Sequence, residues 1–211
     1  MNEQIAKGHK RNIELAKEYL KKSGFYTDKT GKLYDKEGHL VEFDLYTNAG
    51  NTERESTGVM IKEDLAELGM KINFKPIEFN SLIGKLTGTL DWDTMIMGLT
   101  GSTLEPHGGK NVWNSNGPLH IFNQRTEDNF GKKVLPFEKQ IDEIYEKGAA
   151  ELNFQKRKQY YDRYQEIIYK ERPVIYLYSQ LRLIAVRNRI GNVYPTKLGG
   201  ASHNLPEIYV K

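Results

Sequence analysis

The sequence predicts an α/β fold: a mixed sheet with a parallel core, flanked by helices. Segments with helical spacing of apolar residues alternate with short strand-like runs along the first hundred residues. Strands separated by helices pair in parallel, through right-handed crossovers. The length of 211 residues is enough for one large domain, or for one domain plus a segment of another.

The first predicted elements are a helix, a hairpin and a strand. Residues 12–23 carry apolar residues on one helical face, and Gly24 stands where a helix ends. Residues 28–38 are charged and rich in turn formers, which predicts an exposed hairpin. Residues 40–47 alternate between apolar and polar side chains, as in a strand with one face on the core.

A second helix is expected directly after that strand. Thr52 and Glu55 have the spacing of a capping box, and Asn51 or Thr52 is expected to cap the helix. Gly69 ends it, and residues 71–77 alternate again as a second strand.

A short helix and a central strand complete the first half of the chain. Asn80 or Ser81 is expected to cap the short helix. The apolar run of residues 94–97 lies between a charged pair and Gly98, which predicts a buried central strand.

The segment after this strand is the candidate binding loop. It runs from Leu99 to Trp113 and is long, polar and rich in glycine, and loops of that kind are often functional. The carboxyl ends of parallel strands form the ligand mouth of open α/β sheets. Trp113 is expected either to stack on a solute or to anchor the loop in the core. The predicted ligand-binding residues are Thr100, Gly101, Ser102, Thr103, Trp113 and Asn48.

The second half of the chain predicts mainly helices. A short extended piece is expected at residues 119–123, one helix begins at Pro136, and a longer one is capped by Asn153. Residues 174–178 and 181–186 are strand-like. Tyr160, Tyr161 and Tyr164 of the longer helix are expected to pack in the core, and His107 is expected to be exposed without a partner.

Composition and motifs exclude several classes of function. The chain has no cysteine, so disulfides and thiolate metal sites are absent. Its net charge of +3 comes from interleaved acidic and basic residues, which disfavours a nucleic-acid surface. The beginning of the chain lacks the apolar core of a signal peptide, and no run is long enough to span a membrane. No nucleophile elbow, phosphate loop or paired histidine motif is found, so no enzyme, metal site or cofactor is predicted.

Several segments together resemble the C-terminal lobe of bacterial extracellular solute-binding proteins of family 5, the peptide-binding components of ABC importers. The resemblance lies in their order and spacing along most of the chain. The segments are residues 20–25, 45–51 with Arg54 and Glu55, 65–77, 91–98, 156–161 and 172–178.

The resemblance implies half of a two-lobed, periplasmic-binding-protein-like (class II) receptor that closes on its solute. Residues 1–186 would form the C-terminal ligand-binding lobe, and residues 187–211 a crossover tail that completes a missing N-terminal lobe. The implied partners are a peptide or another small solute and the membrane subunits of the importer. The implied location is the periplasm or the cell surface, as a lipoprotein. Many peptide-binding members carry Asp at the position of Ser102, where it meets the peptide's amino terminus.

Three alternatives to peptide binding remain open at this point. The solute of such a receptor lobe is an oligosaccharide in some relatives. A small hydrolase would use the carboxylates of Asp91 and Asp93, which flank Trp92. An interaction module would use the exposed former lobe interface as its binding face.

Overall fold

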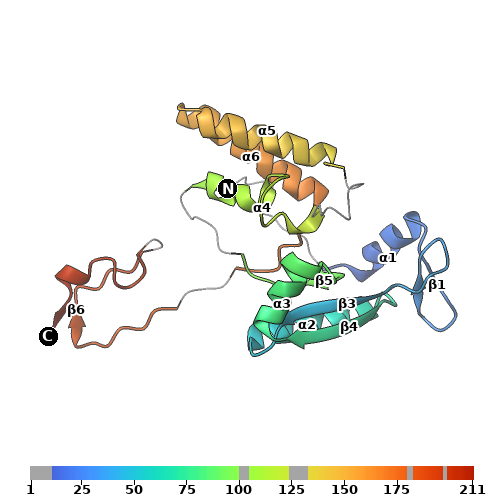
Figure 1. Ribbon diagram of the computed structural model, residues 1–211. Helices are drawn as coiled ribbons and strands as arrows, with labels where there is room; N and C mark the ends of the chain where they lie inside the picture. The colour runs from blue at the N-terminus through green and yellow to red at the C-terminus, as the bar shows by residue number, and fades with distance from the viewer. Residues whose placement is uncertain (1–10, 100–104, 124–132, 180–182, 197–198) are drawn as a thin grey trace. The chain divides into compact units, whose positions relative to one another are not determined.

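The computed structural model describes residues 11–99, 105–123, 133–179, 183–196 and 199–211. By their internal contacts these residues divide into two compact units. Residues 11–99 belong to the first unit and residues 105–211 to the second (Figure 1).

The first unit is built on a three-stranded parallel sheet in the order β4-β3-β5. The central strand is β3 (Glu42–Asn48), which pairs with β4 (Lys71–Ile77) along its whole length. β5 (Thr94–Met95) pairs only with Leu45 and Tyr46. The prediction that residues 94–97 form the central strand is therefore wrong, because β3 has partners on both sides and β5 has only one in the described sheet.

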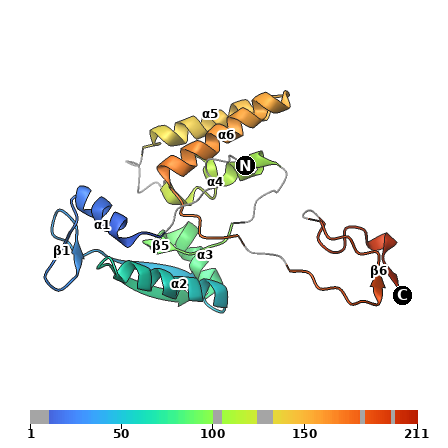
Figure 2. The same cartoon turned by 180° about the vertical axis from the view of Figure 1, so that it is seen from behind.

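Helix α2 (Thr52–Ala66) connects β3 to β4 and covers one face of the sheet (Figures 1 and 2). Side chains from the helix and the strands form a shared apolar core, whose buried members are Leu45, Ile72 and Ile96. Gly58 lets the helix approach closely, since a Cβ atom placed there would lie 2.2 Å from a ring carbon of Phe74.

The N-terminus of α2 begins one residue earlier than the predicted capping box. Asn51 is the N-cap, and its Oδ1 accepts the Arg54 backbone N–H at 3.0 Å. Glu55 accepts the N–H of Gly50 at 2.8 Å, so its carboxylate does not form a reciprocal pair with Thr52. Capping by Asn51, one of the two expected possibilities, is confirmed.

The opposite face of the sheet is covered by α3 (Phe79–Gly84) and the π-helical turn Lys85–Thr89. Tyr46 points to this face, because it follows Leu45 in the strand. The ammonium group of Lys85 lies 5.1 Å from the centroid of the Tyr46 ring. Glu78 caps α3 by accepting the Ser81 N–H at 2.9 Å, so the predicted caps Asn80 and Ser81 are wrong. A carboxylate one residue outside the helix reaches its free N–H groups.

The predicted first helix is confirmed. A hairpin also forms, but its strands begin at Tyr26 and end at Tyr34 instead of spanning residues 28–38, and Leu33 is buried instead of exposed. The helix is α1 (Ile13–Lys22), and the hairpin is an antiparallel pair, β1 (Tyr26–Thr27) with β2 (Leu33–Tyr34). The hairpin is joined to the sheet by backbone hydrogen bonds, from Leu33 N–H to the Gly69 carbonyl at 2.8 Å and from Val41 N–H to the Leu33 carbonyl at 2.9 Å. These bonds place the hairpin beside the amino ends of β3 and β4.

The second unit is centred on two packed helices, α5 (Pro136–Ala150) and α6 (Phe154–Glu171), whose predicted starts are confirmed. Short helical turns pack against them: the 3-10 helix Pro106–Gly109, α4 (Lys110–Trp113) and the 3-10 helix Ile121–Asn123. The predicted extended piece at residues 119–123 is therefore wrong. Its backbone turns because Leu119 and Phe122 both pack against the helix core.

Three tyrosines of α6, Tyr160, Tyr161 and Tyr164, pack in this core, as predicted. The ring of Tyr145 meets those of Tyr161 and Tyr164 edge-on, with centroids 5.8 and 5.5 Å apart. Burial raises the pKa of the Tyr145 hydroxyl well above its usual range, so this phenol stays neutral.

The remaining strand predictions differ from the structure. Residues 174–178 are not in a strand, and Ile175 is 80% exposed. Residues 181 and 182 lie outside the described residues, and 183–186 are not in a strand either. A strand forms only where a partner supplies its hydrogen bonds. In the tail, β6 (Ile190–Gly191) pairs antiparallel with β7 (Tyr209–Val210), ahead of which lies a 3-10 turn, Leu205–Glu207.

Within the described ranges, no helix has the length and apolar character required to cross a bilayer.

The contact between Gly58 and Phe74 predicts opposite effects for two glycine-to-alanine changes. Gly58→Ala forces α2 away from β4, and we expect it to lower the free energy of unfolding by about 1–3 kcal/mol. Gly84→Ala is the matched control, because a Cβ atom there would meet no other described part of the chain within 4 Å. We expect Gly84→Ala to raise stability by about 0.5 kcal/mol, through the lower entropy of the unfolded chain. Urea denaturation of both variants measures this, and equal effects would contradict the packing described.

A carboxylate on β3 predicts an acid-dependent loss of stability. The Asp44 carboxylate accepts hydrogen bonds from Lys75 Nζ at 2.5 Å and from the Tyr46 hydroxyl at 2.9 Å. The bond from Lys75, more than any other contact, holds the pKa of Asp44 below its usual 3.8. Its contribution is therefore complete above that value and is lost as pH falls through the lower pKa of the folded state. We expect Asp44→Asn to be less stable than the parent chain at pH 7 and to approach it near pH 2, as urea denaturation at the two pH values will show. A difference that stays constant with pH would contradict this.

Candidate functional site

The candidate site lies at the carboxyl edge of the parallel sheet. β3 ends at Asn48 and β4 at Ile77, and the chain continues from β5 through buried Ile96 to Gly98. Because the strands are parallel, these ends meet at one edge, which is where open α/β sheets bind ligands. The structure thus places Asn48 at the predicted edge, while its contact with a ligand stays a prediction.

Arg54 links two of these strand ends. Its Nη1 donates to Asn48 Oδ1 at 2.6 Å, and the capping of α2 by Asn51 fixes its backbone. Its Nη2 lies so close to the chain at Gly98 that a Cβ atom there would be 2.7 Å away. The guanidinium is therefore held between the end of β3 and the segment after β5.

The electrostatics of this edge favour oxygen-rich ligands. The half-buried Arg54 forms no ion pair with any residue that the structure describes, and its identified side-chain partner is the neutral amide of Asn48. A guanidinium has five N–H donors, more than this one bond uses. The N-terminus of α2 adds partial positive charge at the same place. The arrangement can donate hydrogen bonds to carbonyl, carboxylate or hydroxyl oxygens.

Four of the predicted ligand-binding residues lie outside the described residues. They are Thr100, Gly101, Ser102 and Thr103, and their contact with a solute stays a prediction. Leu99, the last described residue before them, is exposed.

The expectation of a loop without regular structure as far as Trp113 is wrong for residues 106–113. This part forms two helical turns, and Val112 and Trp113 enter the core of the second unit. Trp113 is 7% exposed and packs against Phe122 and Tyr164, so it fills the role of core anchor, one of the two that the sequence left open.

Polar contacts fix the beginning of the same segment. Glu105 accepts the His107 backbone N–H at 2.9 Å and Arg157 Nη2 at 2.7 Å, and these two contacts, the first above all, keep the pKa of Glu105 below its usual value. Nδ1 of His107 lies 3.2 Å from the Tyr161 hydroxyl. The prediction of an exposed His107 without a partner is therefore wrong, since the ring packs between tyrosines of α5 and α6.

A buried histidine–glutamate pair joins the end of this segment to α5. His120 Nε2 lies 3.0 Å from Glu138 Oε1, and both side chains are almost fully buried. His120 Nδ1 lies 2.9 Å from the Val112 carbonyl, which can only accept, so this nitrogen carries a proton. Glu138 also accepts the Leu135 N–H at 2.7 Å. The only sign of this pair in the sequence is the position of Glu138 in the first turn after Pro136.

The two carboxylates considered for hydrolysis serve separate structural contacts. Asp91 is 79% exposed at its side chain and pairs with Lys85 Nζ at 2.5 Å. Asp93 accepts the backbone N–H of Asp44 at 2.9 Å, at the side of β3. A pair of carboxylates that act as general acid and base is buried, and both face the same substrate. The contacts of Asp91 and Asp93 have neither property.

Sequence reasoning missed Arg54 as a site residue. The signal available was its position in the first turn of a helix that directly follows a strand, where a long cationic side chain reaches the strand ends. Histidine, aspartate and glutamate side chains of the described ranges form no cluster of three or more suited to a metal ion.

Comparisons with known proteins agree with this architecture. The family model for bacterial extracellular solute-binding proteins, family 5 (middle), matches residues 2–119, more than half of the chain. A probable ABC transporter-binding protein of Deinococcus radiodurans is 33% identical over 198 residues, which cover 88% of this chain and 32% of that protein.

Two solved structures share the fold. The oligopeptide-binding protein AppA of Bacillus subtilis, solved with a nonapeptide, superposes with a TM-score of 0.73 at 21% identity, over 96% of this chain and 38% of AppA. In sequence, AppA is 31% identical over 93 residues, 44% of this chain and 17% of AppA. MelB of Agrobacterium fabrum, solved with stachyose, gives a TM-score of 0.68 at 23% identity, over 77% of this chain and 25% of MelB.

The matches thus cover between 17% and 38% of the length of these relatives. The match to the family model covers the whole parallel sheet with its flanking helices, including Asn48 and Arg54. This chain belongs to the bacterial extracellular solute-binding proteins of family 5.

Proposed function

We propose that this chain is one lobe of an importer's solute receptor and binds a peptide without chemical conversion. The observation that carries the proposal is the carboxyl edge of the sheet, where Asn48, Arg54 and Gly98 meet around a cationic group without an ion-pair partner among the described residues. Peptide backbones offer carbonyl oxygens at every residue and a carboxylate at one end, which suits such donors.

The family and its relatives support the same reading. AppA is an oligopeptide-binding protein by name, and the Deinococcus relative is described as a probable ABC transporter-binding protein. We infer that the partners of this chain are the membrane subunits of an ABC importer and that it acts outside the cytoplasm, as the family description implies. The likeness to MelB extends to the fold alone, so it does not favour an oligosaccharide as the solute.

The lobe is proposed to comprise residues 1–186, with residues 187–211 crossing to a second lobe. The apolar side chains of Ile175, Leu177 and Leu183 are exposed. Exposed apolar surface of this kind is usually covered by another part of the protein, which supports the proposal of a second lobe. Pairing of β6 with β7 gives the tail a small structured element of its own.

The proposal predicts weak peptide binding that depends on Arg54. A single lobe supplies only part of a pocket's walls, so we expect a dissociation constant in the range of about 0.1–1 mM for the 211-residue chain. Arg54→Gln removes charge-assisted donors, and we expect it to weaken binding about tenfold. Calorimetric titration with pooled peptides of five to nine residues measures both values.

Arg163→Gln is the matched control for this test. Arg163 is also a helical arginine, but it pairs with Glu166 on the exposed side of α6. We expect this variant to bind as the parent chain does. Equal binding by parent and Arg54→Gln, with unchanged thermal unfolding, would contradict the assignment of Arg54. Tighter binding of stachyose than of any peptide would contradict the solute class.

A further inference from the structure

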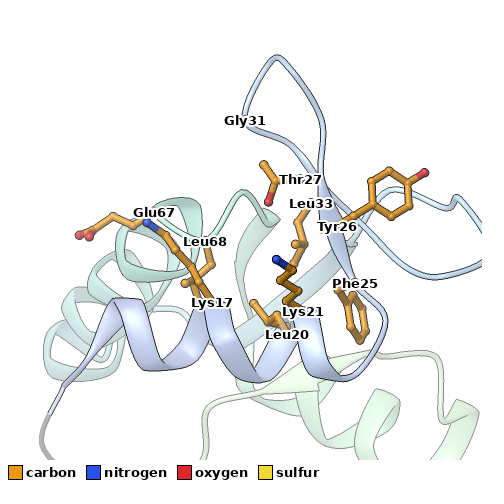
Figure 3. Close-up of a pocket in the computed structure, with 10 residues that line it drawn as sticks. All are labelled: Lys17, Leu20, Lys21, Phe25, Tyr26, Thr27, Gly31, Leu33, Glu67 and Leu68. Atoms are coloured by element: carbon orange, nitrogen blue, oxygen red, sulfur yellow. The ribbon is translucent and has the colours of Figure 1, made fainter.

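A groove on the first unit is separate from the carboxyl edge. It lies between α1, the β1–β2 hairpin and the end of α2, with a volume of about 500 Å³ (Figure 3). Leu33, which lines it, is bonded through its backbone to Gly69 and Val41, next to the first residues of β4 and β3. The groove is therefore at the amino edge of the sheet, whereas Asn48 and Arg54 are at the other.

The floor of the groove is apolar. Leu20 from α1, Phe25 and Leu33 from the hairpin region, and Leu68 from the turn after α2 line it together. Figure 3 shows these side chains converging from three separate elements. Leu33 is 3% exposed, so the floor belongs to the packed structure. A surface of this kind favours an aliphatic chain by removing it from water.

The rim of the groove carries an excess of positive charge. Lys17 and Lys21 are one turn apart on α1, and both line the groove. The acidic residue of the lining, Glu67, already pairs with Arg11 at 2.6 Å. Lys17 is 3.0 Å from Glu14 in an exposed pair, and Lys21 forms no ion pair with the described residues. Exposed pairs of this type exchange partners at little cost in free energy.

We propose that this groove binds an aliphatic carboxylate of about six to ten carbons, at a site independent of the solute edge. The carboxylate contacts the ammonium groups of Lys17 and Lys21, and the chain lies over Leu33 and Leu68. The volume fits the range typical of small-molecule sites. The positive charge of the two lysines favours an anion. The apolar floor favours an anion with a hydrocarbon chain over an inorganic anion. This inference goes beyond peptide binding and does not rest on it.

Sodium octanoate is the probe for this site. In a titration of the full chain followed by methyl and amide NMR at pH 7, we expect saturable shifts at Leu20, Leu33 and Leu68. The double variant Lys17→Gln/Lys21→Gln should weaken octanoate binding at least fivefold. The matched control is Lys22→Gln: Lys22 is on the same helix, is 3.9 Å from Glu18, and does not line the groove. This control should bind octanoate as the parent does.

Three results would overturn the proposal. One is octanoate binding that is unchanged in the double variant, and another is equal or tighter binding of 1-octanol, which has the chain without the charge. The third is the absence of saturable shifts at the three leucines. Leu68→Glu gives a second line of evidence, because a carboxylate in the floor should abolish octanoate binding while leaving peptide titrations as they were. If the parent chain binds octanoate but no peptide, the proposed function is contradicted and the proposal for the groove is not.

Discussion

The parallel pairing of β3 with β4 is the constraint on which the rest of the first unit depends. Seven residue pairs, from Glu42 with Lys71 to Asn48 with Ile77, fix the register. Parallel strands require a crossover, and α2 provides it while lying against the sheet at Gly58. The same crossover places the first turn of α2 at the carboxyl edge, which is why Arg54 reaches Asn48. A one-residue slip would turn the core side chains outward and separate these two residues.

The second unit is stabilised in a different way, by aromatic rings packed in its core and by buried polar contacts. Tyr145, Tyr161 and Trp113 supply apolar surface, and the pair of His120 and Glu138 ties the incoming segment to α5. Glu138 also accepts hydrogen bonds from the Asn123 side chain and the Leu135 N–H, so the pair is part of a buried network of polar contacts. The helical turns at residues 106–113 exist because this core holds them, although their glycine-rich sequence favours a loop.

Elements with a strong local pattern were predictable, and contacts between distant segments were not. The spacing of apolar residues and the caps Asn51 and Asn153 placed α2 and α6 correctly. Asn48 followed from the rule for strand ends. Residues 174–178 misled the prediction because their apolar composition favours a strand, while strand formation needs a partner that the described chain does not supply. His107 and His120 gain their roles from residues 54 and 18 positions away, and no local pattern records such pairs. Arg54 lies only six positions from Asn48, and its place at the start of a helix after a strand was a usable signal.

We propose that the carboxyl edge of the β4-β3-β5 sheet faces the solute. Site-resolved amide hydrogen exchange of the chain, with and without a saturating peptide pool, can test this placement. We expect slower exchange at residues 48–54 and 96–99, with little change in α5, α6 or the groove beside α1. Slower exchange confined to α5 and α6, or to residues 17–33, would contradict it.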